Sequence, residues 1–363
     1  MTGAGVRNEI SAGEQAPVVQ GVPSLLARLF GSKRATFLTL SVGAVVLLIT
    51  AKALQWAVLG ATGPWSPASD CGLNAGACWP FLIDKTPLIL FGTYDYAERW
   101  RPLAATLLLL ALSGATLFLR LRPWILIAAW TLALVAFLVL MQGGTFGLPQ
   151  VPVARWNGLP VLLFLAAFGL AAAFPLGLLL ALGRRSALPL LAKACAGYIE
   201  VARGVPMVTV LFFGVFVLPL VVPGGRIEPL YAALVALILF HAAYVAEDLR
   251  GGLQTIRRGQ YESARALGLR ESQVLRWVIL PQAIRAAVPA LTTTAIGGFK
   301  DTSLVVIVGL YDLMATAKMA YNDPQWQGRA PEAYLLVGAI FFVICWAVAV
   351  AGRRMERLLA SPR

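Results

Sequence analysis

The sequence predicts an all-α, polytopic integral membrane protein, built as a helix bundle of about eight transmembrane helices. Hydrophobic residues make up 59% of its 363 residues and charged residues only 13%, and the mean hydropathy is +0.77. A soluble domain of this length does not need so much apolar surface, whereas each bilayer span needs about 20 mostly apolar residues. Backbone groups in lipid must be satisfied within their own segment, so these spans are expected to be helices.

Long apolar runs, each bounded by charged residues or by Pro and Gly, account for the predicted helices. The eight expected spans are residues 36–60, 103–119, 123–141, 158–182, 205–222, 229–248, 284–308 and 333–351. The polar segment 1–35 has no early apolar run, so we expect no cleavable signal peptide and an uncleaved first span.

The basic residues predict the orientation. With a cytoplasmic N-terminus, 21 of the 30 Lys and Arg residues lie on the cytoplasmic side and seven lie outside. Because Lys and Arg accumulate in cytoplasmic loops, we expect both termini to be cytoplasmic, as tails 1–35 and 353–363. The formal net charge of +13 therefore indicates membrane orientation rather than nucleic-acid binding, since the basic residues lie in short loops between spans.

Two of the four cysteines lie in the long loop 61–102, which this orientation places in the periplasm. These two, Cys71 and Cys78, can form a short-loop disulfide or remain two free thiols. We expect Cys195, in a cytoplasmic loop, and Cys345, in the last span, to be inert. No spacing of Cys and His resembles a metal site.

A polar insert at residues 250–283 interrupts the apolar pattern on the cytoplasmic side. Residues 257–267 are rich in helix formers, and Gly268 suits a left-handed helix end. A second helix is expected from Glu271 to Pro281, where the proline interrupts it. Two helices joined at a glycine make a rigid shape that fits a groove on another protein. A solvated basic loop near anionic lipid would explain the arginine content but not this spacing.

The two helices of the insert are expected to have distinct faces. Glu262 and Arg265 are three residues apart and are expected to form a pair on one face. The buried side of the second helix is expected to consist of Val274, Leu275, Val278 and Ile279.

The insert contains Glu262-Ser263-Ala264, then Gly268, then "ILP" ending at Pro281. This pattern resembles the EAA loop of ABC importer permeases, with Ser263 in place of the usual Ala. In that family the loop forms a coupling helix that docks into a cleft on a cytoplasmic ATPase. The resemblance implies that this chain is coupled to its ATPase by Glu262, Ser263, Ala264, Leu267, Gly268 and Pro281.

Flanking segments extend the resemblance over about 156–352. "YIEVARGVPMVTVLFF" (198–213) and "KDTSLVVIVGLYDL" (300–313) are similar to the polar amino-acid branch of these permeases. "GACWPFLIDKTPLILFGTYDYAERWR" (76–101) is similar to the M-type subunit of general L-amino-acid ABC permeases. The resemblance implies a five-helix, MetI-like type I importer core at 156–352, preceded by a three-span extension at 36–155.

The energy source is expected to lie in another chain. No G-x-x-x-x-G-K-[ST] phosphate loop occurs in the sequence, so we expect no ATP hydrolysis, no catalytic residue and no cofactor here. The resemblance implies ATPase subunits that use the ATP, a second permease subunit in a hetero- or homodimer, and a periplasmic amino-acid-binding protein. The implied function is the import of L-amino acids across the bacterial inner membrane.

Charged residues at membrane depth are costly, so they indicate function. The segment "KDTS" in the seventh span offers an acceptor for an ammonium group and donors for a carboxylate. Its residues are Lys300, Asp301, Thr302 and Ser303. Gly297 and Gly298, just before it, are expected to loosen the helix where it lines a cavity. The alternative is a Lys–Asp pair that neutralises itself and fixes a helix end.

Two other functions compete with this interpretation. A secondary, ion-coupled transporter of amino acids or small solutes often has paired broken helices in two halves. No second segment like "GGFKDTS" occurs in the N-terminal half. An intramembrane enzyme would need a metal cluster or a Ser/His pair, and the single histidine, His241, supplies neither. We expect His241 to be a helix-packing contact.

Overall fold

The computed structural model describes residues 29–72, 76–119, 122–222 and 227–360. These residues form helices and connecting loops, with an isolated β-bridge between Gly158 and Asp312. The expected tails fall partly outside this description, at 1–28 and 361–363. The predicted all-α membrane bundle is confirmed.

The helices follow one another along the chain. Their bounds are α2 Lys33–Leu54, α3 Trp79–Phe91, α4 Trp100–Phe118, α5 Pro123–Gln142, α6 Leu159–Gly183, α7 Pro189–Gly204, α8 Met207–Phe212, α9 Leu218–Val221, α10 Pro229–Gln254, α11 Arg258–Ala266, α12 Glu271–Gln273, α13 Leu280–Asp301, α14 Leu313–Tyr321 and α15 Ala330–Ala360.

The chain divides into two compact units. One contains the residues up to Thr62 together with 69–77, and its helix is α2, which has no buried residue along its length. The other contains 63–68 and all residues from Cys78 onward, and it holds α3 to α15. The expected boundary between an extension and a core at residue 155 is a different division and stays a prediction.

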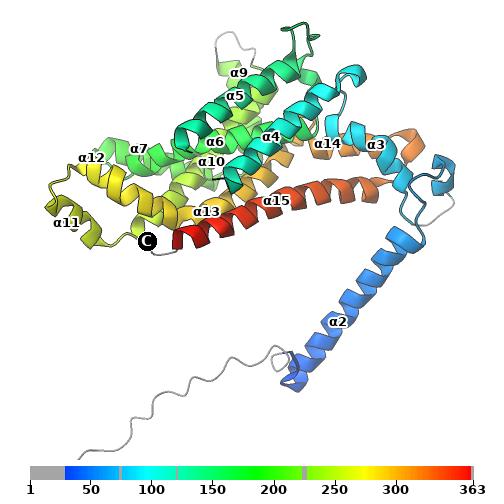
Figure 1. Cartoon of the computed structure of the whole chain (residues 1–363), viewed down its shortest axis with the longest axis horizontal. Coiled ribbons are helices and arrows are strands. Elements are labelled where there is room, and N and C mark those ends of the chain that lie inside the picture. Colours follow the sequence, from blue (N-terminus) through cyan, green and yellow to red (C-terminus); the bar gives the residue numbers. More distant parts are fainter. Residues whose placement is uncertain (1–28, 73–75, 120–121, 223–226, 361–363) are drawn as a thin grey trace, which may run out of the picture. The chain divides into compact units, whose positions relative to one another are not determined.

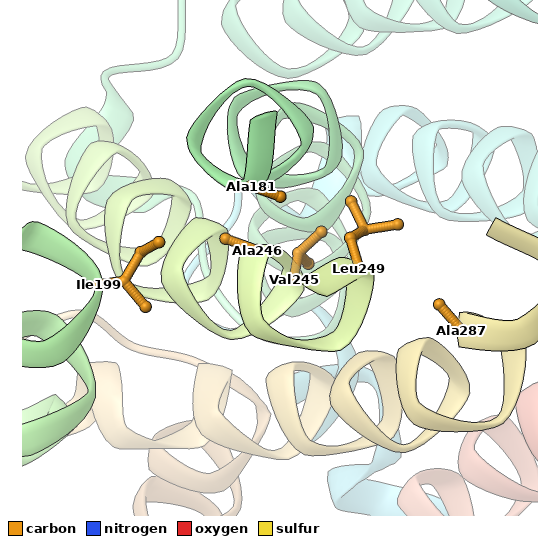
Figure 2. Packing of buried hydrophobic residues seen from close by; sticks show 6 residues of the cluster. All are labelled: Ala181, Ile199, Val245, Ala246, Leu249 and Ala287. Atoms are coloured by element: carbon orange, nitrogen blue, oxygen red, sulfur yellow. The ribbon is translucent and has the colours of Figure 1, made fainter. Parts of the chain in front are cut away.

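In the larger unit, α10 lies at the centre of the core. It packs against α6, α7 and α13, and α13 packs in turn against α15 (Figure 1). Figure 2 shows the apolar cluster where four of these helices meet, formed by Ala181, Ile199, Val245, Ala246, Leu249 and Ala287. Three of its six residues are alanines, and small side chains let the helix backbones approach closely within a membrane.

Among the described residues, six helical segments are long and apolar enough to cross a membrane, or up to seven if one bent pair is counted as a span, whereas eight spans were expected. The segment expected as one span at 205–222 belongs to that pair, in which α7 meets α8 and α9 at 107°. Val205, at the bend, has an extended backbone with φ −98° and ψ 137°. The physical reason is Pro206, because a proline disfavours helical backbone at the residue before it.

The two ends of the larger unit differ. α11 and α12 lie at one end and α3 and α14 at the other (Figure 1). α3 occupies part of the segment 61–102 that was expected as a loop, and it packs against α14. Its 13 residues are too few to span a bilayer. An ion pair also holds this helix, since Lys85 contacts Asp323 at 2.7 Å.

Candidate functional site

The polar insert folds as two helices joined at a glycine turn. α11 ends at Ala266, and Gly268 has φ +77°, in the left-handed region that favours glycine. The amide of Gly268 donates to the carbonyl of Arg265, and the amide of Leu269 donates to that of Ala264. These bonds close the end of the helix. A Cβ at Gly268 would meet no atom within 4 Å, so the backbone conformation alone requires glycine here.

The first helix of the insert has a buried face and an exposed face. Ala264 belongs to the buried face, in an apolar cluster with Leu253, Val274, Ile279 and Ala283. Glu262 and Ser263 are exposed, and Leu267, at the end of the helix, is 81% exposed. An exposed leucine beside a carboxylate and a hydroxyl forms a small surface of mixed apolar and polar character, which suits contact with another protein.

Glu262 attracts Arg265 within α11, as expected, but each residue makes its ion pair with another partner. Glu262 pairs with Arg258, one helical turn earlier, at 3.0 Å. Arg265 instead reaches across the glycine turn to Glu271 and makes two bonds, at 2.6 Å and 3.1 Å. A guanidinium matches a carboxylate best in this two-bond geometry, and the turn brings Glu271 within reach. The turn is therefore held by an ion pair as well as by its backbone.

Pro281 was expected to interrupt the second helix, but it does not. It lies in the first turn of α13, and the chain before it, Val274–Ile279, winds as a wider π-helix. A proline lacks an amide hydrogen and clashes with the carbonyl four residues earlier, and π-type widening accommodates both defects. The insert is therefore joined to α13 by continuous helix, which gives a stiff connection into the core.

A partly open cavity of about 380 Å³ lies between α8, α10 and α13. Its polar residues come from α10 and α13 and its apolar ones mainly from α8 and α10. It is lined by Met207, Phe240, His241, Tyr244, Thr293, Thr294, Gly297, Gly298 and Asp301.

Within this cavity, His241 and Asp301 contact each other. The Nε2 of His241 lies 3.2 Å from Oδ2 of Asp301, and its Nδ1 lies 2.9 Å from the carbonyl of Leu237. A carbonyl only accepts, so Nδ1 is the donor in its contact with Leu237, and Nε2 faces the carboxyl group of Asp301. His241 was expected to be only a packing contact, and its contact with Asp301 was not foreseen. The presence of one ionisable residue in each of two spans could have indicated this contact.

The glycines before Asp301 do not loosen α13, which continues as an α-helix to Asp301 and then tightens to a 3₁₀ helix over Thr302–Val308. Gly298 instead permits the contact with His241, because a Cβ there would lie 2.9 Å from the imidazole ring.

The other residues of the "KDTS" segment lie differently from Asp301. The hydroxyls of Thr302 and Ser303 donate to carbonyls three residues earlier in the chain. Lys300 is exposed, and no ion pair joins it to Asp301 in the described part of the chain. Asp301 therefore pairs with His241 on another helix and not with Lys300, as the alternative interpretation had it.

A second charged group lies where α6, α7 and α10 end beside the insert. Glu247 accepts from Arg250 at 2.9 Å and lies 3.5 Å from Arg203 and 3.7 Å from Arg184. Next to it, Asp248 accepts from the hydroxyl of Thr294 at 2.6 Å. One carboxylate with three guanidiniums ties these helix ends together.

At the opposite end of the unit, Asp312 caps α14. It is fully buried, and Oδ1 accepts from the amide of Ala315 at 2.9 Å. Burial raises the pKa of this carboxyl to about 6, despite backbone hydrogen bonds that favour its charged form.

Cys71 and Cys78 are disulfide-bonded in the structure, whereas Cys195 and Cys345 are free thiols. No cluster of three or more His, Cys, Asp or Glu side chains suited to a metal ion occurs in the described part of the chain.

Comparisons with known proteins place these features in context. Residues 173–360 match the family described as "Binding-protein-dependent transport system inner membrane component". The chain is 41% identical over 316 residues to "Inner membrane amino-acid ABC transporter permease protein YhdY" of Escherichia coli, a match that covers 85% of each chain. It is 31% identical over 429 residues to "Glutamate/glutamine/aspartate/asparagine transport system permease protein BztC" of Rhodobacter capsulatus, covering 98% of each.

Among solved structures, "Crystal structure of an amino acid ABC transporter with histidines" is 30% identical to this chain. The match covers 54% of this chain and 89% of that chain, with a TM-score of 0.49.

Proposed function

The chain belongs to the family of binding-protein-dependent transport system inner membrane components, and we propose that the solutes its importer carries across the bacterial inner membrane are L-amino acids. As a permease subunit it is a transport protein and not itself an enzyme. Support for the solute class comes from relatives whose names specify amino acids and from the cavity, which offers a carboxylate and an imidazole to a zwitterion.

Transport by this family is coupled to a separate ATPase, and we propose that the polar insert is the contact. The observation that carries this proposal is the two-faced α11, which exposes Glu262, Ser263 and Leu267 beside a rigid Gly268 turn. Ala264 anchors the helix and Pro281 lies in its stiff connection to α13. ATP is bound by the partner chain. A second permease subunit and a periplasmic amino-acid-binding protein complete the proposed assembly.

The test is reconstitution with the ATPase and the binding protein, followed by uptake of a panel of labelled amino acids. Glu262→Lys reverses an exposed charge at the proposed contact, and a mismatched charge at a docking surface costs affinity. We expect this variant to insert and to pair with the second permease, but to lose capture of the ATPase and substrate-stimulated ATP hydrolysis. Arg354→Gln changes an exposed charge on the last helix and serves as the control. Full ATPase capture and uptake by Glu262→Lys would contradict the proposal.

We propose that both termini and residues 250–283 are cytoplasmic, as the basic residues predict. The probe is Ser263→Cys in a variant whose free thiols, Cys195 and Cys345, are replaced by Ser. An impermeant thiol reagent is expected to label this site in inverted vesicles and not in intact cells. Labelling of intact cells would reverse the orientation.

We propose that Asp301 contacts the ammonium group of the solute. Its Oδ2 is held by His241, and no described residue donates to its Oδ1. An ammonium group is a strong donor that can satisfy this second oxygen, while His241 keeps the carboxylate in place. Lys300, Thr302 and Ser303 belong to the same proposed pathway segment, but the two hydroxyls donate to backbone carbonyls and Lys300 is exposed.

The segment 61–102 is proposed to be periplasmic, with Cys71 and Cys78 closing one short disulfide in that oxidising compartment. Mass spectrometry of non-reduced peptides should find the two linked. Two thiols that alkylate freely, in protein isolated without reductant, would exclude the bond.

A further inference from the structure

A recessed pocket at the insert end of the bundle is lined mainly by arginines. Its volume is about 330 Å³, and its lining residues are Arg184, Arg185, Arg250, Leu253 and Gln254. The first two directly follow α6, and the other three lie in the last turns of α10. The pocket is therefore at the level where two apolar spans give way to charged residues, which is the headgroup region of a bilayer.

The three guanidiniums of this pocket are not equally neutralised. Arg184 pairs with Glu200 at 3.1 Å and lies 3.7 Å from Glu247, whose carboxylate also accepts from Arg250 at 2.9 Å. Arg185 instead donates to the hydroxyl of Tyr261 at 3.2 Å and lies over its ring, 5.9 Å from the centroid. No ion pair between residues that the structure describes includes Arg185. The pocket thus holds a cationic group whose partner is neutral.

Two arginines of the pocket are partly buried, and the third is open to solvent. The side chains of Arg184 and Arg250 are 27% and 31% exposed, and Arg185 is exposed. An accessible guanidinium beside two partly buried ones, all lining one small volume, suits a compact anion better than a broad protein surface. Arginine matches phosphate oxygens by paired hydrogen bonds, and basic pockets between transmembrane helices bind anionic lipid headgroups.

We propose that this pocket binds a phosphate group, supplied by the headgroup of an anionic phospholipid. Arg185 provides the guanidinium that has no carboxylate to release, and Arg184 and Arg250 complete the cationic wall. The bound phosphate would join the ends of α6 and α10. Because Arg185 contacts Tyr261 on α11, the bound phosphate would also affect the position of α11. Lipid composition is therefore expected to influence the position of the insert. The proposal depends neither on the solute nor on the orientation of the chain.

The experiment uses the assembled transporter in nanodiscs of phosphatidylcholine with or without phosphatidylglycerol, and native mass spectrometry counts the lipids that remain bound. Arg185→Gln is expected to lose one tightly held phosphatidylglycerol for each copy of this chain, with about tenfold weaker retention, because it removes a charge-assisted bond pair. Arg185→Lys is expected to be intermediate, since it keeps the charge without the paired geometry.

Two matched controls separate this site from general effects. Arg354→Gln removes an exposed positive charge that does not line the pocket, and it should retain the lipid as the wild type does. Tyr261→Phe removes the neutral partner of Arg185 and keeps the guanidinium, so it should also retain the lipid. If Tyr261→Phe loses the lipid to the same extent as Arg185→Gln, the contact between these residues explains the loss, and the proposal is overturned.

A third arm identifies the source of the phosphate. Inorganic phosphate is added to phosphatidylcholine nanodiscs at fixed ionic strength, and protection against heat is compared with that given by phosphatidylglycerol. Protection by the lipid that Arg185→Gln abolishes supports the proposal. Protection by inorganic phosphate alone overturns the lipid source. Unchanged lipid retention in Arg185→Gln, together with lost capture of the ATPase, assigns the pocket to a protein partner instead.

Discussion

The polar insert and the central cavity hold their charges in opposite ways. In the insert, Arg258 and Glu262 form an ion pair whose side chains are 92% and 60% exposed. In the cavity, His241 is 5% exposed and Asp301 36% exposed. Exposed pairs contribute about 0–1 kcal/mol, whereas removing one partner of a buried pair costs about 3–5 kcal/mol, and somewhat less where water reaches one of the partners.

This contrast separates recognition from stability. A charge that contributes little to the fold, such as Glu262, can be recruited by a partner protein without weakening the permease. The two side chains of the cavity contact each other, so a change in one alters the position of the other. Substitutions in the insert should therefore affect coupling, and those in the cavity should affect transport itself.

The largest effect is expected for Asp301→Asn. The amide keeps the size of the side chain but removes the charge that the ammonium group and His241 both need. We expect uptake to fall by at least about tenfold, which corresponds to one lost charge-assisted interaction of about 1.4 kcal/mol. Uptake by the reconstituted transporter is the measurement, with assembly checked by co-purification of the ATPase.

The matched control for this prediction is Lys300→Gln. Lys300 precedes Asp301 and is also charged, but it is exposed and does not line the cavity. It should change uptake much less than Asp301→Asn does. Equal losses in both variants would show that the whole segment acts as a unit, and unchanged kinetics in Asp301→Asn would remove this residue from the pathway.

A smaller effect, confined to coupling, is expected for Gly268→Val. The left-handed conformation that Gly268 adopts costs a residue with a side chain about 1–2 kcal/mol, and a branched residue more. A Cβ at this position would have no atom within 4 Å, so crowding adds nothing to this cost. We expect normal insertion and about tenfold lower substrate-stimulated ATP hydrolysis, in line with the strain.

Two variants isolate the backbone conformation as the cause. Gly268→Asn should be milder, because asparagine tolerates the left-handed region. Gly259→Val places the same side chain on α11 at a glycine without positive φ and with open space around it. If Gly259→Val impairs coupling as strongly as Gly268→Val, bulk on the surface is responsible and the turn is not.

The insert could be predicted from sequence because its geometry is local. The helix formers, the glycine turn and the apolar spacing lie within about thirty residues, and each acts through its near neighbours. Its errors were also local in kind. Pro281 was expected to end a helix, but a π-helical turn accommodates it. Arg265 was expected to pair within its helix, but the turn offers Glu271 a better geometry.

The cavity could be predicted only in part, because it depends on how helices meet. The sequence indicated Asp301 by the cost of a charge in a span, but the partner of that charge is 60 residues away on α10. Only the packing of α10 on α13, with Gly298 at the contact, brings His241 within reach. The three-arginine pocket is hidden in the same way, since α6 and α10 are distant in sequence.

The smallest effect on transport is expected at Asp312, a buried carboxylate with no cationic partner among the described residues, where the change concerns stability. Burial raises its pKa from the usual 3.8 to about 6, so the folded state binds this proton more tightly than the unfolded state does. Above pH 6 the buried charge opposes folding by up to about 3 kcal/mol, at about 1.4 kcal/mol per pKa unit. This cost decreases as the pH falls through 6 towards 3.8.

Asp312→Asn keeps the acceptor for the amide of Ala315 but does not titrate. Its apparent Tm should therefore exceed that of the wild type at pH 7.5, and by a smaller margin at pH 5. Asp323→Asn should instead lower the apparent Tm at pH 7.5. A hydrogen bond from Lys85 lowers the pKa of Asp323, so the stabilisation that its charge gives is lost as the pH falls. Thermal unfolding in detergent across this pH range decides the matter, and wild-type and Asp312→Asn curves that run parallel would show that Asp312 is not the group that titrates.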